Sequence, residues 1–211
     1  MTPADDHAGA APASAPSAAE ATEAAPVPPA APAGLLRRPV VLVGLMGAGK
    51  TTVGRRLAAQ LHAPFVDSDE AVEDAARMSV AEIFETMGEA AFRDGERKVI
   101  ARLLTEAPQV VATGGGAWMN EATRAEIRAC SATVVWLRAD LDVLVERVGR
   151  RAGRPLLAGG DPREILSRLM AQRNPVYETA DLAVESRGDE RHEAVVERMM
   201  VALRRRGDVT G

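Results

Sequence analysis

The stretch GLMGAGKT, residues 44–51, decides the fold of this chain. It satisfies the pattern GxxxxGK[ST] and follows an apolar run, residues 39–44 (PVVLVG), that is too short and too rich in β-branched residues to form a helix by itself. A helical pattern begins where the stretch ends, at about residue 50. A glycine-rich loop between a buried strand and a helix is the setting in which this pattern binds the phosphates of a nucleotide.

The loop supplies each kind of group that a triphosphate needs. Its glycines let successive backbone N–H groups turn toward a phosphate, and the following helix adds unsatisfied donors and about half a positive charge at its N-terminus. We expect Lys50 to reach the β- and γ-phosphates and the Thr51 hydroxyl to bind Mg²⁺. A glycine-rich turn with a solvated lysine is the alternative. The predicted ATP site consists of Gly47, Ala48, Gly49, Lys50, Thr51 and Thr52.

Short apolar runs alternate with longer amphipathic stretches over the rest of the chain. Strands are expected at residues 39–44, 109–113, 132–137 and 181–185, with a weaker candidate at 64–66. Helical patterns occupy residues 50–62, 69–77, 79–87, 88–106, 120–129, 140–150, 162–174 and 189–206, and their starts are marked by Ser79 with Glu82, Asn120, Asp140 and Asp161. This alternation predicts an α/β fold with a five-stranded parallel sheet flanked by helices on both faces.

The composition excludes several classes of protein. The 211 residues suit one domain with an appendage, and the apolar (46%) and charged (27%) fractions are ordinary for a globular chain. The net charge of −4 gives no sign of a nucleic-acid or membrane-surface partner. Cys130 is the single cysteine, which excludes an intrachain disulfide and favours the cytoplasm. No apolar run approaches the roughly 18 residues of a membrane-spanning helix. We expect a monomer.

The first residues differ in composition from the rest. Residues 1–34 contain 14 alanines and 7 prolines, so no hydrophobic face can be drawn through them and the prolines prevent a continuous helix. Asp5, Asp6 and the dispersed prolines do not fit a secretory signal, and a transit peptide is expected to be rich in arginine and poor in acids. We expect residues 1–38 to be a disordered extension and residues 39–211 to form the folded domain.

Two aspartates, Asp67 and Asp69, follow the weaker strand candidate. The carboxyl end of a parallel strand is where open α/β sheets bind ligands, and residues i and i+2 of an extended segment point the same way. Beside a phosphate loop, carboxylates organise Mg²⁺ and orient an attacking hydroxyl. The alternative is structural: Asp67 ends a strand and Asp69 caps the next helix.

Two glycine-rich segments are further candidates. Residues 114–116 (GGG) follow the strand that ends at Thr113, and they are either a flexible turn or a place where backbone amides approach a ligand. Residues 149–160 (GRRAGRPLLAGG) lie between two helical patterns and carry positive charge. We expect this second segment to be a mobile lid that closes over a triphosphate.

Several segments, taken in order, resemble those of the shikimate kinase family. They are GLMGAGKTTVGRRLA (44–58), FVDSDEAVE (65–73), SVAEIFETMGEAAFRDGE (79–96), TGGGA (113–117), RAGRPLL (151–157) and QRNPVY (172–177). The resemblance covers residue 39 to about residue 200 and implies the architecture of a P-loop kinase with a lid at about residues 149–160. It also implies roles for individual residues.

On the acceptor side, the resemblance implies that Asp69 binds the hydroxyl groups of shikimate, while Asp67 organises Mg²⁺ and the acceptor hydroxyl. Arg93 and Arg173 correspond to the two arginines that grip the carboxylate, and Glu96 lies within helical reach of Arg93. Gly115 corresponds to a glycine that contacts the substrate. The remaining expected substrate contacts are Gly114, Gly116, Phe84 and Phe92, the two phenylalanines being alternatively part of the core.

On the nucleotide side, Arg154 resembles the lid arginine that reaches the transferring phosphates, and Arg147 resembles an arginine beside the adenine. An arginine at the phosphates stabilises charge on their equatorial oxygens. The expected catalytic residues are therefore Lys50, Asp67 and Arg154, and the expected metal ligands are Thr51 and Asp67. Arg187 and Arg191 compete for a further nucleotide contact, which stays unassigned.

The resemblance implies an enzyme that transfers the γ-phosphate of ATP to the 3-hydroxyl of shikimate, giving 3-phosphoshikimate and ADP in chorismate and aromatic amino acid biosynthesis. The chain has neither an NKxD motif nor a long apolar run ending in Asp-Glu, so it is not typical of a GTPase switch or a motor ATPase. Two alternatives remain: another small-molecule kinase of this fold, acting on gluconate or a nucleotide, and a nucleotide-binding regulatory protein.

Overall fold

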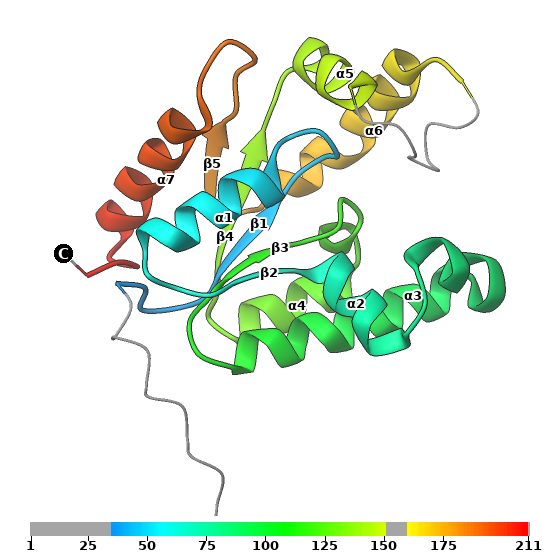
Figure 1. The fold of residues 1–211 in the computed structure, drawn as a ribbon, viewed down its shortest axis with the longest axis horizontal. Coiled ribbons are helices and arrows are strands. Elements are labelled where there is room, and N and C mark those ends of the chain that lie inside the picture. The colour runs from blue at the N-terminus through cyan, green and yellow to red at the C-terminus, as the bar shows by residue number, and fades with distance from the viewer. Residues whose placement is uncertain (1–34, 151–159, 211) are drawn as a thin grey trace, which may run out of the picture. The chain divides into compact units, whose positions relative to one another are not determined.

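The computed structural model describes residues 35–150 and 160–210 (Figure 1). Residues 40–150 and 160–206 form the expected α/β fold, a parallel sheet of five strands in the order β2-β3-β1-β4-β5 with helices on both faces. The strands are β1 (Val40–Val43), β2 (Phe65–Asp67), β3 (Val110–Ala112), β4 (Thr133–Arg138) and β5 (Leu182–Glu185). The helices are α1 (Lys50–Gln60), α2 (Ser68–Ala76), α3 (Val80–Thr105), η1 (Ala117–Met119), α4 (Glu121–Ala129), α5 (Leu141–Gly149), α6 (Pro162–Tyr177) and α7 (His192–Arg206).

Strand β1 lies in the middle of the sheet. It pairs in parallel with β3 and β4, so that Val41 lies opposite Val111 on one side and Val134 on the other. All four residues of β1 are fully buried. A strand buried on both faces has no reason to alternate apolar and polar residues, which explains the continuous apolar run in the sequence.

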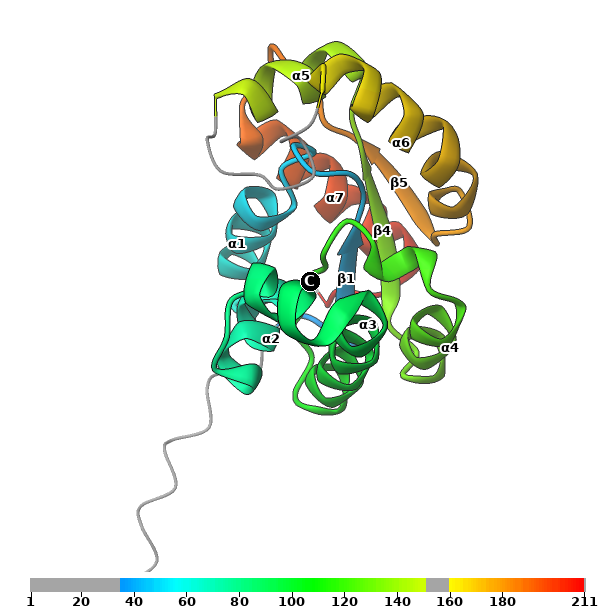
Figure 2. The same cartoon turned by 90° about the vertical axis from the view of Figure 1, so that its right-hand side faces the viewer.

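The connections between strands run in two directions across the sheet. The chain passes from β1 toward β2 at one edge, and from there through β3 and β4 toward β5. Because such crossovers are right-handed, α1 lies on one face and α3, α4 and α6 on the other (Figure 2). The loops after β1 and β3 therefore diverge to opposite faces at the carboxyl edge of the sheet, which is where sheets of this kind bind ligands.

The helix starts follow the caps that the sequence marks. Ser79 and Glu82 form a reciprocal capping box, and Asn120 and Asp161 each accept a backbone N–H of the first turn. Asp140 stands at the N-cap of α5 but makes no side-chain cap bond. Two boundaries differ from expectation by three residues: α6 continues through Pro175 to Tyr177 instead of ending at residue 174, and α7 begins at His192 instead of residue 189.

The boundary of the folded part also differs from expectation. Leu36, placed in the extension by the sequence, is buried and forms an antiparallel bridge with Val209. Arg37 donates its backbone N–H to Asp208 O, and Arg38 Nε lies 3.1 Å from Asp208 Oδ1. The folded part therefore includes residues 35–38, because the C-terminal segment supplies them with backbone and charge partners.

Residues 151–159, which include Arg154 and most of the expected lid, lie outside the described residues, as do residues 1–34, for which disorder was expected. Among the described helices, none combines the length and the apolar character needed to cross a bilayer.

Candidate active site

The loop between β1 and α1 has the backbone that its glycines permit. Gly44 has a φ of 137°, and a Cβ at this position would lie 2.6 Å from the carbonyl oxygen of Leu137, so both the conformation and the space require glycine. Gly49, also at positive φ, stands at the N-cap of α1, and Lys50 and Thr51 begin the helix. The amide donors at this helix start are thus oriented as an anion site requires.

The Lys50 side chain has hydrogen-bond partners within the phosphate loop. Lys50 Nζ donates to the carbonyl oxygens of Gly44 (2.8 Å) and Leu45 (3.1 Å), which places the ammonium group over the start of the loop.

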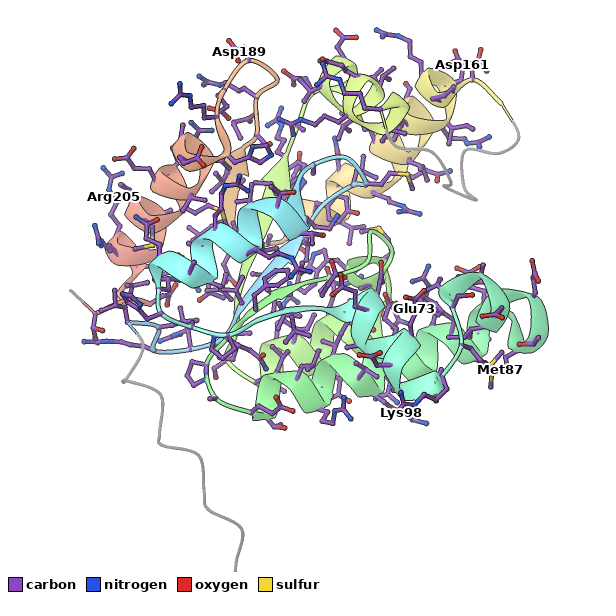
Figure 3. The ribbon with its side chains drawn as sticks, viewed as in Figure 1. Glu73, Met87, Lys98, Asp161, Asp189 and Arg205 are labelled. Carbon is purple, nitrogen blue, oxygen red and sulfur yellow. The ribbon has the colours of Figure 1, made fainter. Side chains whose placement is uncertain are left out.

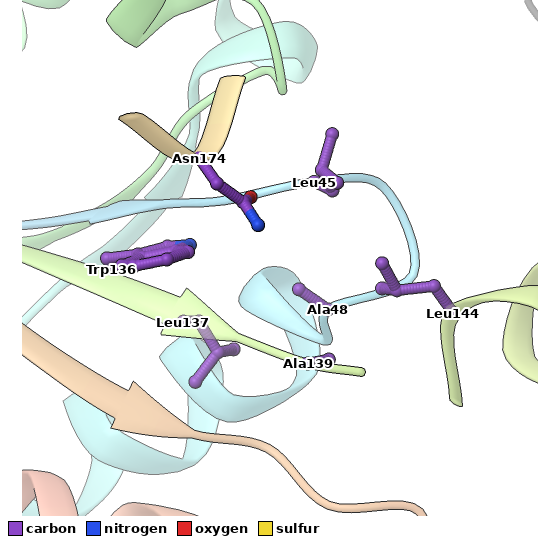
Figure 4. A pocket seen from close by; sticks show the side chains of 7 residues that line it. All are labelled: Leu45, Ala48, Trp136, Leu137, Ala139, Leu144 and Asn174. Carbon is purple, nitrogen blue, oxygen red and sulfur yellow. The ribbon is translucent and has the colours of Figure 1, made fainter. Parts of the chain in front are cut away.

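A small pocket lies next to the phosphate loop, between β4 and α6, and is shown in Figure 4. Its lining consists of Leu45, Ala48, Trp136, Leu137, Ala139, Leu144 and Asn174. Apolar side chains thus form most of the pocket wall.

Thr51 and Asp67 link the phosphate loop to β2. The Thr51 hydroxyl donates to Asp67 Oδ2 at 2.8 Å, and Asp67 Oδ1 accepts the backbone N–H of Asp69 at 3.1 Å. Asp67 is thus the N-cap of α2, and the two aspartates do not share one extended segment as expected. The expected geometry was wrong because α2 begins at Ser68, directly after the strand. Asp69 is instead brought to the site by the first turn of the helix.

Asp69 lies in a confined place beside the loop 114–116. A Cβ on Gly114 would lie 2.5 Å from Asp69 Oδ1 and 2.9 Å from Glu96 Oε1, so both carboxylates contact this glycine closely. Burial, and next to it the charge of Asp67, raises the pKa of Asp69, while Lys50 and Arg93 oppose the shift. The carboxylates of Asp67 and Glu96, the Lys50 ammonium group and the Arg93 guanidinium group therefore all lie within electrostatic range of Asp69.

Arg93 is held by a buried acid on its own helix. Its Nη1 donates to Glu96 Oε2 at 2.7 Å, and the Glu96 side chain has no exposed surface. Glu96 Oε1 has no hydrogen-bond partner within the described residues, and burial raises the pKa of this carboxyl. The guanidinium group lies against Gly116, where a Cβ would come within 2.5 Å of Nη2. The expected support of Arg93 by Glu96 is confirmed.

The two phenylalanines meet across a break in α3. In a straight helix, residues 84 and 92 are separated by about 12 Å along the axis, yet the ring centroids of Phe84 and Phe92 are 4.7 Å apart. The break is at Gly88, whose φ of 80° and ψ of 170° are not helical. Phe92 is buried in the core and Phe84 is 37% exposed, and the Arg93 guanidinium lies 5.0 Å from the Phe92 ring.

Helix α6 holds the loop 114–116 from the opposite side. Arg173 Nη1 donates to the carbonyl oxygen of Gly115 at 2.9 Å, and the Tyr177 hydroxyl donates to the same oxygen at 2.6 Å. A Cβ on Gly115 would lie 3.6 Å from Gly44 O, so the loop borders the phosphate loop. The structure thus brings Asp69, Arg93 and Arg173 around one loop.

Arg147 approaches the other end of the phosphate loop. Its Nη1 donates to Ser186 Oγ at 2.8 Å and lies 3.4 Å from the carbonyl oxygens of Gly47 and Ala48. Its Nη2 donates to Arg187 O at 2.6 Å, and burial lowers its pKa. Arg147 thus joins the phosphate loop to the segment after β5. The described contacts give no role in nucleotide binding to Arg187 or Arg191.

Two residues at the site were not singled out by the sequence. Ser68 is fully buried and accepts the N–H of Gly114 on its hydroxyl at 3.2 Å. Tyr177 was quoted in the segment QRNPVY without a role. It is the single tyrosine of the chain and stands four residues after Arg173, which places both on one face of a helix. That spacing was the signal available in the sequence.

A phosphate loop that opens a helix, with acids and arginines gathered at the carboxyl edge of a parallel sheet, defines a P-loop kinase of small molecules. The family model described as shikimate kinase matches residues 46–204. The chain belongs to the shikimate kinase family.

Individual relatives agree with this assignment. The chain is 55% identical over 167 residues to a shikimate kinase of Bradyrhizobium diazoefficiens, covering 79% of this chain and 80% of that protein. It is 57% identical over 171 residues to a shikimate kinase of Paramagnetospirillum magneticum, covering 81% of this chain and 87% of that protein. The solved structure of shikimate kinase from Acinetobacter baumannii in complex with shikimate superposes with a TM-score of 0.75 at 34% identity, covering 80% of this chain and 94% of that one.

Proposed function

We propose that this chain transfers the γ-phosphoryl group of ATP to the 3-hydroxyl of shikimate and releases 3-phosphoshikimate and ADP. The observation that carries the proposal is the environment of the loop 114–116. Asp69 and Arg93 lie against it on one side and Arg173 on the other, and its middle residue borders the phosphate loop at Gly44. An acceptor that carries both hydroxyl groups and a carboxylate matches this set of one acid and two guanidinium groups.

For the nucleotide, we assign the phosphates to the backbone amides and side chains of Gly47, Ala48, Gly49, Lys50, Thr51 and Thr52. The helix N-terminus and the Lys50 ammonium group both favour anionic oxygens, and Lys50 already lies over the loop. Arg147 is assigned to the base side of the nucleotide because it joins this loop to the segment after β5. Arg154 is assigned to the transferring phosphates on the resemblance alone.

Thr51 and Asp67 fit a magnesium ion. Their oxygens are 2.8 Å apart, and oxygen ligands are those that Mg²⁺ prefers. Among the described residues there is no group of three or more His, Cys, Asp and Glu side chains that could hold a metal. That agrees with Mg²⁺, which is usually held by one or two protein groups together with substrate phosphates. When bound with ATP, the ion would neutralise negative charge on the transferred phosphoryl group.

Asp67 lies beside the phosphate loop, where its carboxylate accepts the Thr51 hydroxyl. In phosphoryl transfer through a loose transition state, positioning and charge stabilisation contribute most, and an early base contributes little. We therefore assign Asp67 an orienting role and assign Asp69 the acceptor's other hydroxyl groups. Arg93 and Arg173 bind the carboxylate, with Gly114, Gly115 and Gly116 as the backbone of the site and Phe84 and Phe92 beside the ring.

A coupled assay of ADP release tests the proposal with four conditions: shikimate, gluconate, AMP and no acceptor. We expect turnover with shikimate that exceeds the other three conditions by at least about a hundredfold, the discrimination that unpaired buried charges impose. Turnover on gluconate or AMP but not on shikimate would overturn the assignment in favour of another kinase of this fold. ADP release that no acceptor accelerates would point to a regulatory nucleotide-binding protein.

We further propose that the protein acts in the cytoplasm as a monomer, without a nucleic-acid or membrane partner. The modest net charge of −4 supports the lack of a nucleic-acid or membrane partner, and the single cysteine supports the cytoplasm. Light scattering on the purified protein and fractionation of cells test the two points. A stable dimer, or recovery with membranes, would contradict them.

A further inference from the structure

Tyr177 occupies an unusual place for a tyrosine at the end of a helix. It is the last residue of α6, only 1% of its surface is exposed, and its ring stacks on Trp136 of β4 with centroids 5.9 Å apart. Trp136 in turn lies next to the phosphate loop, since a Cβ on Gly44 would come within 3.5 Å of its ring. The tyrosine ring is therefore fixed by the core, and only its hydroxyl reaches the loop 114–116.

That hydroxyl holds the middle of a loop that has no side chains of its own. Glycine loses more conformational freedom on ordering than any other residue, so three in a row need outside contacts to adopt one conformation. Ser68 holds the N–H of Gly114 at one end, and Met119 donates its N–H to Gly116 O at the other. In the middle, Gly115 O accepts from Tyr177 and Arg173, which occupy both of its lone pairs.

The two donors to Gly115 O, Arg173 and Tyr177, differ in charge and in their capacity to bind a second partner. Arg173 carries a charged fork of five N–H groups and, under the function proposed above, is needed by the carboxylate of the acceptor. Tyr177 is uncharged and buried, and burial raises its pKa to about 12, so it keeps its proton at any working pH. Under the proposed function, Arg173 is thus drawn toward the carboxylate of the acceptor, whereas the Tyr177 hydroxyl stays on the carbonyl oxygen of Gly115.

We propose that Tyr177 is a positioning residue for the acceptor: its hydroxyl keeps the loop 114–116 in the binding conformation, which frees Arg173 to turn from Gly115 to the acceptor's carboxylate. This inference rests on the proposed function, because it assigns Arg173 to that carboxylate. It gives Tyr177 no contact with the substrate and no part in moving the phosphoryl group.

The variant Tyr177→Phe tests the inference, since it keeps the ring and its stack on Trp136 and removes only the hydroxyl. We expect the KM for shikimate to rise about five- to tenfold, the effect of one lost hydrogen bond. The KM for ATP and kcat are expected to stay within about twofold, because the phosphate loop is not touched. The matched control is Thr133→Val, which removes a buried hydroxyl that donates to Asp208 Oδ2 at 2.9 Å. We expect the control to lower stability without changing either KM.

Amide hydrogen exchange of residues 114–116 in the unliganded protein is the second measurement, and it does not depend on the substrate. We expect exchange to be about tenfold faster in Tyr177→Phe than in wild type, and unchanged in Thr133→Val. An unchanged KM for shikimate in an active Tyr177→Phe enzyme, or unchanged exchange in the loop, would overturn the inference. Failure of the wild-type protein to phosphorylate shikimate would instead overturn the proposed function, and the exchange result would still decide whether Tyr177 holds the loop.

Discussion

Arg93 and Glu96 form an ion pair in which one partner is fully buried. Arg93 Nη1 lies 2.7 Å from Glu96 Oε2, and the arginine keeps 23% of its side chain exposed while Glu96 has none. A carboxylate at that depth has lost its hydration, so its partner determines how it is satisfied. The pair therefore fixes the guanidinium against Gly116 and leaves the exposed part of Arg93 available to a ligand.

The first prediction concerns Arg93→Ala. We expect the KM for shikimate to rise about 10- to 100-fold, the range for losing a charge-assisted hydrogen-bonded pair, with the KM for ATP nearly unchanged. Steady-state kinetics with each substrate varied in turn measures both. Arg97→Ala is the matched control, because Arg97 lies on the same helix and pairs with Asp94 and Glu126. An equal effect of the two variants would show that Arg93 has no special part in acceptor binding.

The second prediction is a graded response of the three loop glycines to alanine. A Cβ on Gly114 would lie 2.5 Å from Asp69 Oδ1 and one on Gly116 2.5 Å from Arg93 Nη2, whereas one on Gly115 meets nothing closer than 3.6 Å. We expect Gly114→Ala and Gly116→Ala to reduce kcat/KM for shikimate by about a hundredfold, since displacing a positioned group by about 1 Å has that effect. Gly115→Ala should be much milder. A larger loss of kcat/KM in Gly115→Ala than in Gly114→Ala and Gly116→Ala would contradict this placement of Asp69 and Arg93.

The fold and the phosphate loop could be predicted from the sequence because both depend on local patterns. The buried strand β1, the glycines of the loop and the start of α1 lie within residues 40–60, so spacing alone identifies them. The surroundings of the loop 114–116 join segments that are far apart in the chain, such as Arg93 with Gly116 and Tyr177 with Gly115. No pattern within one segment encodes these contacts. Only the family resemblance pointed to Arg93 and Arg173, whereas the glycine run itself marked residues 114–116 as a candidate.

The aspartate pair shows where local reasoning failed. The period of an extended strand predicts that residues 67 and 69 point the same way, but α2 begins at Ser68 and Asp67 caps it. In the structural alternative, the strand end at Asp67 is confirmed, but the residue that caps the next helix is Asp67 and not Asp69. Asp67 also accepts the Thr51 hydroxyl. A cap and a strand end can coincide in one residue, and the pattern cannot separate the two.

The third prediction is that Asp69→Asn makes the protein more stable and less active. Asp69 has a raised pKa because of burial and the neighbouring Asp67 charge, so its contribution to stability is fully present below its ordinary pKa of 3.8 and is lost as the pH rises through the raised value. The free energy of unfolding of Asp69→Asn, measured in urea, should therefore exceed that of wild type by an amount that grows from pH 4 toward pH 8. The KM for shikimate should rise about tenfold or more.

Asp94→Asn is the control for this pH dependence. Hydrogen bonds from Lys98 and Arg97 lower the pKa of Asp94, so its contribution to stability is present above its ordinary pKa and is lost as the pH falls. Its replacement should thus slightly destabilise the protein at neutral pH and leave the kinetics unchanged. If Asp69→Asn destabilised the protein at pH 8, burial would not raise the pKa of Asp69 as described above.

The fourth prediction compares the two lysines of the chain. Lys50→Ala should lower kcat by about a hundred- to a thousandfold, as expected for losing one charge at the transferring phosphates, while the circular dichroism spectrum and Tm stay close to wild type. The fold is expected to survive because the hydrogen bonds from Lys50 to the loop carbonyls of Gly44 and Leu45 are only part-buried, so water can bond to these carbonyls once the ammonium group is removed. Lys98→Ala, which removes an exposed pair with Asp94, should keep full activity (Lys98 is labelled in Figure 3). Transfer that persisted in Lys50→Ala would contradict the assignment of the phosphate site.

The fifth prediction uses two glycines of one helix. Gly88 and Gly95 both lie in α3, and a Cβ at either position would meet nothing within 4 Å, so alanine tests the backbone alone. Gly95 is helical, and Gly95→Ala should stabilise the protein by about 0.5–1 kcal/mol. Gly88, with φ 80° and ψ 170°, has a backbone that alanine adopts only with strain, and Gly88→Ala should destabilise by about 1–3 kcal/mol.

Urea unfolding of the two variants measures both free energies, and the opposite signs remove any general effect of adding a methyl group. The Gly88 variant should also affect the acceptor site, because the break at Gly88 is what brings Phe84 onto Phe92, next to Arg93. We therefore expect its KM for shikimate to rise while that of Gly95→Ala does not. If Gly88→Ala were as stabilising as Gly95→Ala, α3 would be straight in solution, and the ring contact between Phe84 and Phe92 would be lost with the break.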